Sequence, residues 1–140
     1  MTNIRFFTED IHFTLKNKTK IRQWITATIH HHHKQIHSIN YIFTSDNYIL
    51  TINKDYLNHD TFTDIITFNH SSNPEQIETD IFISIPRVKA NSHQLKISFT
   101  EELHRVMIHG ILHLLGYNDK TTTERQEMRK KENHYLALRF

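Results

Sequence analysis

Two histidines, four residues apart, are the side chains in this sequence best spaced to bind one metal ion. They are His109 and His113, at the start and in the middle of the segment HGILHLLGYND. Residues four apart on an α-helix differ by about 40° around the axis and by one turn in height, so both imidazoles can reach the same ion. Such a pair on its own is more often an ordinary feature of a helix face.

Two residues that follow the pair favour a metal site. Gly116 suits the left-handed conformation that ends a helix, which lets the chain turn back. Asp119 stands six residues after His113, at the spacing used when a helix supplies two ligands and the next turn a third. We therefore predict that His109, His113 and Asp119 hold one ion per chain. The alternative is that Asp119 only caps a helix starting near Thr121.

The predicted ligands restrict the chemistry of the site. Two imidazoles, one carboxylate and an open position suit Zn²⁺ acting on water, and the same set accepts Mn²⁺, Ni²⁺ or Fe²⁺. Metalloproteases with this histidine spacing carry a glutamate directly after the first histidine as general base, and here that residue is Gly110. Peptide hydrolysis by that mechanism is therefore disfavoured, and metal-assisted attack on another bond is preferred.

The rest of the sequence predicts the elements that must position these residues. Alternating β-branched and aromatic residues predict strands over 4–14, 38–45, 47–53, 63–68 and 79–84. The strands over 38–45 and 47–53 should form a hairpin, and a short polar turn or helix should follow over 53–60. Apolar spacing and capping residues predict helices over 19–36, 86–93 and 101–115, and a last helix after Thr121. Strands first and helices last, with one early crossover, indicate an α+β domain with one mixed sheet of about four strands packed by helices.

Composition indicates one domain over residues 1–140. A chain of 140 residues can bury one core, and no stretch has linker composition. The formal net charge of +2 is too small to identify a nucleic-acid partner by itself. Cysteine is absent, so any metal must rest on His, Asp, Glu or water. With no apolar run long enough for a membrane span and no signal-peptide pattern, we expect a cytoplasmic protein without a membrane partner.

Four motifs together resemble the YbeY family of bacterial endoribonucleases and rRNA maturation factors. HGILHLLGY followed by Asp119 matches the metal-binding motif of that family, and the match continues upstream over most of the chain. The upstream motifs are Asn53-x-x-Tyr56, TDIITF at 63–68 and TDIFIS at 79–84. The resemblance implies an α+β sandwich, a zinc ion, and hydrolytic cleavage of single-stranded RNA in 16S rRNA 3′-end processing and ribosome quality control. It also implies the 16S rRNA precursor and the small ribosomal subunit as partners.

Two positions depart from the family pattern. Asp119 stands where the third metal-binding histidine of the family is usual, and a carboxylate tilts the preference of the site towards harder ions. Leu57 stands where the family often has an arginine, a residue suited to holding phosphate. Arg87, just after the second strand motif, is our candidate replacement, although a solvated surface arginine is the more ordinary interpretation.

Other charged and polar residues have two interpretations each. Asp64 either makes a hydrogen bond at a strand edge or lines the metal cleft as a catalytic candidate, and His104 lies about 140° around the helix from His109, in a second shell or at the surface. The run His30–His33 is either a solvated helix face or an adventitious metal binder. Basic residues of the last helix either track an RNA backbone or form a salt-bridged solvent face with Glu124, Glu127 and Glu132; they are Arg125, Arg129, Lys130 and Lys131.

From these observations we predict a metal-dependent hydrolase that cuts single-stranded RNA. The rival enzyme is a metallopeptidase, which Gly110 disfavours. The rival from another class is a ribosome-assembly factor that binds RNA or ribosomal protein around a structural metal without cutting.

Overall fold

A computed structural model describes residues 3–58 and 63–140, and those residues form four strands and five helices. In chain order these are β1 (Ile4–Glu9), α1 (Lys18–His31), β2 (Gln35–Thr44), α2 (Asp46–Leu57), β3 (Ile65–Asn69), β4 (Gln76–Ser84), α3 (Ile85–Leu95), α4 (Phe99–Leu114) and α5 (Thr122–Ala137). Across the described part of the chain, every helix is too short or too polar to cross a lipid bilayer.

The strands form one mixed sheet in the order β1-β2-β4-β3. β1, β2 and β4 run parallel to one another, and β3 pairs antiparallel with β4 at the edge of the sheet. Parallel neighbours need a crossover, which α1 provides between β1 and β2. The predicted α+β class, with one mixed sheet of about four strands packed by helices, is confirmed.

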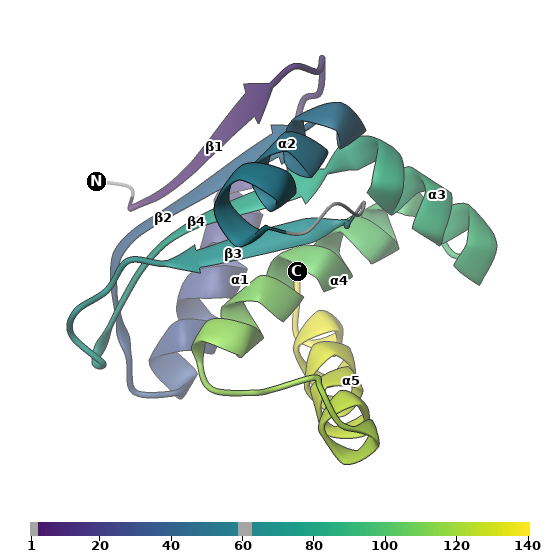
Figure 1. The fold of residues 1–140 in the computed structure, drawn as a ribbon. Coiled ribbons are helices and arrows are strands. Elements are labelled where there is room, and N and C mark those ends of the chain that lie inside the picture. The colour runs from purple at the N-terminus through teal and green to yellow at the C-terminus, as the bar shows by residue number, and fades with distance from the viewer. Residues whose placement is uncertain (1–2, 59–62) are drawn as a thin grey trace.

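Helices cover both faces of this sheet (Figure 1). On one face α1 and α4 enclose the main core, in which Tyr41 and Met107 are fully buried and the Tyr41 hydroxyl donates to the Met107 carbonyl at 3.0 Å. On the opposite face α2 packs over a smaller cluster of Ile49, Ile52 and Ile66. Helix α5 packs against α4 on the side away from the sheet. Helix α4 is therefore held between the sheet and α5, and both layers can reach its side chains.

The predicted hairpin is wrong. Residues 38–45 belong to the long strand β2, but 47–53 lie in helix α2 instead of a second strand. Ser45 begins this helix, since its hydroxyl accepts a hydrogen bond from the Tyr48 amide at 3.1 Å. A strand would turn Ile49 and Ile52 to opposite faces, whereas a helix brings these residues, three apart, to the one face that is buried against β3 and β4. Residues 53–57 continue the helix, Asn58 ends it with a positive φ of 56°, and residues 59–62 lie outside the described residues.

The remaining predicted elements exist with shifted boundaries. β1 ends at Glu9, five residues before the predicted end of the first strand at residue 14. α1 ends at His31 because His33 adopts a positive φ of 59°, which no α-helix accommodates. The helices predicted over 86–93 and 101–115 are α3 and α4, each extended at its start, where Ser84 and Ser98 cap them.

Candidate metal centre

Helix α4 presents the two predicted histidine ligands. It begins at Ser98, whose hydroxyl accepts from the Glu101 amide at 3.0 Å, and two glutamates in its first turn favour the positive end of the helix dipole. One side of the helix is apolar and buried, with Met107, Ile108 and Ile111 inaccessible to solvent. His109 and His113 are therefore held on a rigid element.

Gly116 ends the helix in the way that the sequence predicted. Its φ of 108° lies in the region that favours glycine. The Gly116 amide donates to the His113 carbonyl and the Tyr117 amide donates to the Leu112 carbonyl, each at 3.1 Å, which is the bond pattern of a Schellman motif. This turn reverses the chain and brings the following loop back over α4.

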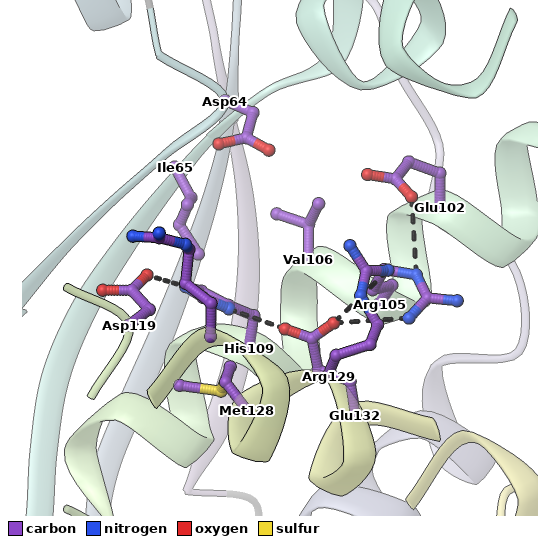
Figure 2. Close-up of a pocket in the computed structure, with 11 residues that line it drawn as sticks. Asp64, Ile65, Glu102, Arg105, Val106, His109, Asp119, Met128, Arg129 and Glu132 are labelled. Carbon is purple, nitrogen blue, oxygen red and sulfur yellow. Dashed lines mark hydrogen bonds and ion pairs between the residues drawn. The ribbon is translucent and has the colours of Figure 1, made fainter. Parts of the chain in front are cut away.

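The returning loop places Asp119 beside the first histidine. Asp119 Oδ2 lies 3.4 Å from His109 Nε2, and both side chains are partly exposed (Figure 2). A cavity of about 490 Å³ is lined by His109, His113 and Asp119 together, with Asp64 also on its wall. The three residues predicted as ligands thus face one cavity.

In the described residues, no three His, Cys, Asp or Glu side chains are arranged as a group that could hold a metal ion. His109 and Asp119 meet directly, and His113 shares their cavity without closing such a group. The donors nevertheless suit the predicted ion, because two imidazoles and a carboxylate are the ligand types of catalytic zinc sites. The chemistry of the donor set therefore fits a divalent metal.

Carboxylates surround His109 on two sides. Its Nδ1 lies 2.8 Å from Glu132 Oε2, opposite the Asp119 contact at Nε2 (Figure 2). Burial by itself lowers the pKa of His109, but the hydrogen bond and charge of Glu132, helped by Asp119 and Asp64, outweigh it and hold the pKa above its usual value. A proton or a metal ion at this imidazole is therefore stabilised by nearby negative charge.

Asp64 stands at the wall of this site. It lines the 490 Å³ cavity and a second cavity of about 310 Å³, and both cavities include His109 and Asp119. Burial raises the pKa of the Asp64 carboxyl, opposed by backbone amides and by the charge of His109. Asp64 therefore lines the cleft and also accepts hydrogen bonds from backbone amides at the start of the strand, so both of its predicted placements are present.

The backbone of α4 lies close to the sheet at Gly110. A Cβ atom there would lie 3.1 Å from Ile65 Cδ1, 3.3 Å from Thr67 Oγ1 and 3.4 Å from Ile81 Cδ1. The position at which a metalloprotease carries its general base thus faces β3 and β4, where a glutamate side chain would have to displace these neighbours.

Comparison with known proteins assigns the family. The sequence model described as "Endoribonuclease YbeY" matches residues 3–138. The chain belongs to the YbeY family. A relative named Endoribonuclease YbeY from Amoebophilus asiaticus is 49% identical over 134 residues, covering 96% of this chain and 91% of the relative. Another of that name, from Cytophaga hutchinsonii, is 48% identical over 136 residues, covering 97% and 95%.

A solved structure supports the same fold. The solution structure of TM1509 from Thermotoga maritima superposes with a TM-score of 0.67 at 25% identity, covering 95% of this chain and 86% of that one. Leu57, at the position where the resemblance implied an arginine, lines the cavity that contains His109, His113 and Asp119. This side chain makes that part of the cavity wall apolar.

Arg87, the candidate replacement for that arginine, is engaged elsewhere. Its Nη2 lies 2.6 Å from Asp46 Oδ2, an ion pair that joins the start of α3 to the start of α2. Arg87 is not among the residues that line either cavity around His109. The structure thus does not bring Arg87 to the candidate site.

His104 occupies neither of its predicted places. It is 4% exposed, its ring lies 5.8 Å from that of Trp24, and the Arg139 guanidinium donates to its Nδ1 at 2.6 Å. Burial and the Arg139 charge lower the pKa of His104 to about 4. It is a neutral core residue on the side of α4 that faces α1.

One member of the histidine run supports the ligand loop. His32 Nδ1 donates to the Thr28 carbonyl at 2.8 Å, so its Nε2 accepts from the Tyr117 hydroxyl at 3.0 Å. Tyr117 lies between Gly116 and Asp119, so this bond anchors the loop that returns Asp119 to α4. The other three histidines, His30, His31 and His33, are exposed.

Sequence reasoning missed the role of Glu132. It was assigned to a solvent-facing salt bridge, but it is 5% exposed and bonded to His109. Its position carried a signal, since Met128, Glu132, Tyr135 and Leu136 share the spacing of one helix face, and the three others are buried core residues. A carboxylate on an apolar stripe needs a buried partner.

Proposed function

We propose that this chain is a metal-dependent, single-strand-specific endoribonuclease acting in 16S rRNA 3′-end maturation and ribosome quality control. The observation that carries the proposal is the approach of Asp119 to His109 at 3.4 Å, in a cavity shared with His113, within a chain of the YbeY family. Its partners would be the 16S rRNA precursor, as substrate, and the small ribosomal subunit, and we expect it to act in the cytoplasm. Residues 1–140 would serve as one such domain.

His109, His113 and Asp119 are the proposed ligands of a single Zn²⁺ ion. Because Asp119 replaces an imidazole by a harder oxygen donor, Mn²⁺ or Fe²⁺ is an acceptable alternative. When bound, the ion supplies Lewis acidity for attack of water on a phosphodiester.

Asp64 is the proposed proton acceptor. It lines both cavities that contain His109, and burial raises its pKa, which makes its carboxylate a better proton acceptor. Arg87 takes no part in this proposal because it is paired with Asp46. Leu57 supplies no cation, so phosphate binding at that wall would rest on the metal and on other residues.

Two rivals make different predictions. A metallopeptidase would need a general base next to His109, where Gly110 packs against Ile65 and Thr67. An assembly factor with a structural metal would bind RNA without cleaving it.

A cleavage assay on single-stranded RNA separates the three possibilities. We expect the purified protein to cut the RNA, to lose activity in a chelator, to recover it with Zn²⁺ or Mn²⁺, and to leave casein intact. His113→Ala should be inactive, and His93→Ala, an exposed histidine on α3, should match the wild type. Binding without cleavage would favour the assembly factor, and casein cleavage that needs His113 would favour the peptidase.

A further inference from the structure

Glu132 is a buried carboxylate whose two oxygens have different partners. Oε2 lies 2.8 Å from His109 Nδ1. Oε1 lies 3.3 Å from Arg105 Nη1 and 3.8 Å from Arg129 Nη1. Figure 2 shows Glu132 between His109 on one side and the two arginines on the other. The carboxylate thus links α5 to the metal-site histidine on α4.

The chemistry of a carboxylate fixes which ring nitrogen carries the hydrogen. An ionised carboxylate only accepts hydrogen bonds, so His109 Nδ1 must be the donor. In the neutral ring, Nε2 is then left with a free lone pair. Nε2 is also the atom that lies 3.4 Å from Asp119. The hydrogen bond to Glu132 therefore selects the tautomer whose lone pair faces the other predicted ligand.

Arg105 in turn holds Glu132 in place. Its side chain is 15% exposed, and besides Glu132 it contacts Glu102 at 3.6 Å and donates to Asn133 Oδ1 at 3.0 Å. These contacts fix the guanidinium from α4 and α5 at once. Arg105 and Arg129 both lie beside Oε1, so Oε2 is the oxygen that faces His109 Nδ1. The two arginines therefore hold the Glu132 carboxylate in the orientation in which it accepts from the His109 ring.

We propose that Glu132 is a positioning residue that fixes His109 in the Nδ1–H tautomer and aims Nε2 at the ion. The part that concerns the ion rests on the proposed function, whereas the part that concerns the tautomer does not. Partners of this kind orient ligating histidines in metal sites, and their removal commonly weakens metal affinity about 10–100-fold.

The competing account is that Glu132 only neutralises Arg105 and Arg129. Glu102 provides a matched control, because it is equally buried at 5% exposure and pairs with Arg105, but in the described part of the chain it makes no hydrogen bond or ion pair with His109. Glu132→Gln and Glu102→Gln each remove one charge beside the same arginine with little change of shape. Glu132→Ala would leave two guanidinium groups beside a hole and is unsuitable if it fails to fold.

The first measurement is the tautomer of His109 in metal-free protein, from ring ¹⁵N chemical shifts at alkaline pH. We expect the Nδ1–H form in the wild type and in Glu102→Gln. In Glu132→Gln we expect a mixture, because an amide can donate as well as accept. An Nε2–H ring in the wild type, or the same tautomer in all three proteins, would overturn the proposal.

The second measurement is Zn²⁺ affinity by competition with a chromophoric chelator. We expect about 10–100-fold weaker binding in Glu132→Gln and wild-type affinity in Glu102→Gln. Equal losses in both variants with an unchanged tautomer would show that Glu132 is only a counter-ion. If no protein binds Zn²⁺ while the tautomer still changes in Glu132→Gln, the proposed metal site fails and the positioning of His109 by Glu132 stands.

Discussion

Replacing Asp119 with alanine should remove metal binding while leaving the fold nearly unchanged. The cap of α5 does not depend on Asp119, because Thr121 Oγ1 accepts from the Glu124 amide at 3.1 Å and Glu124 Oε1 accepts from the Thr121 amide at 2.9 Å. What the metal-free protein loses is an ion pair whose carboxylate is 41% exposed. Exposed pairs of this kind contribute about 0.2–1 kcal/mol. The metal-free variant should therefore unfold only slightly more easily than the wild type.

Asp119→Ala should lower the stability of the metal-bound protein by a larger amount. A ligand at 100 times its Kd stabilises a folded protein by about 2.7 kcal/mol, and at its Kd by about 0.4 kcal/mol. Suppose that loss of the Asp119 oxygen weakens zinc affinity 100-fold. A zinc concentration that stabilises the wild type by about 2.7 kcal/mol then stabilises Asp119→Ala by only about 0.4 kcal/mol. Asp119→His should keep the full stabilisation, because a third imidazole is a good zinc ligand.

Thermal and denaturant unfolding with and without zinc measure these differences. Glu127→Ala, an exposed carboxylate on α5, is the control and should respond to zinc as the wild type does. An Asp119→Ala protein that gains as much stability from zinc as the wild type would refute the ligand role. The ion would then rest on His109, His113 and another group.

Three further predictions concern the surroundings of the site. His104 has a pKa of about 4 in the folded protein and about 6.5 in the unfolded chain, so between these pH values only the unfolded chain binds the proton. Lowering the pH from 6.5 to 4 should therefore reduce the free energy of unfolding by up to about 3 kcal/mol. Denaturant unfolding at several pH values should show this loss in the wild type and not in His104→Leu. Gly110→Glu should overpack against Ile65 and Ile81, which lowers the melting temperature and the free energy of unfolding, the latter by about 1–3 kcal/mol or more. A casein assay of this variant should detect no peptidase activity. Ser45→Ala should cost about 1 kcal/mol in denaturant unfolding through loss of the α2 cap, and an unchanged midpoint would contradict that assignment.

Local patterns predicted the part of the site that lies on one stretch of chain. The spacing of His109 and His113 and the glycine at 116 specify a helix and its end, because hydrogen bonds within a few residues decide both. The return of Asp119 follows from that turn. These features needed no knowledge of distant contacts.

Tertiary packing decided what the sequence could not. Residues 47–53 include aromatic and β-branched residues that strands favour, but the packing of Ile49 and Ile52 on the sheet places them in a helix. Glu132 is 23 residues from His109, and its burial depends on how α5 packs against α4. The pairing of Arg87 with Asp46 has no local signal, because the two residues are 41 apart in the sequence.

The position of the bound ion tests the account most directly. Crystals of zinc-loaded protein, measured at the zinc absorption edge, should show one strong anomalous peak per chain. We predict this peak at about 2.0–2.2 Å from His109 Nε2, a ring nitrogen of His113 and a carboxylate oxygen of Asp119. A peak at the exposed histidines of His30–His33, with none beside His109, would contradict the proposed centre and the mechanism built on it.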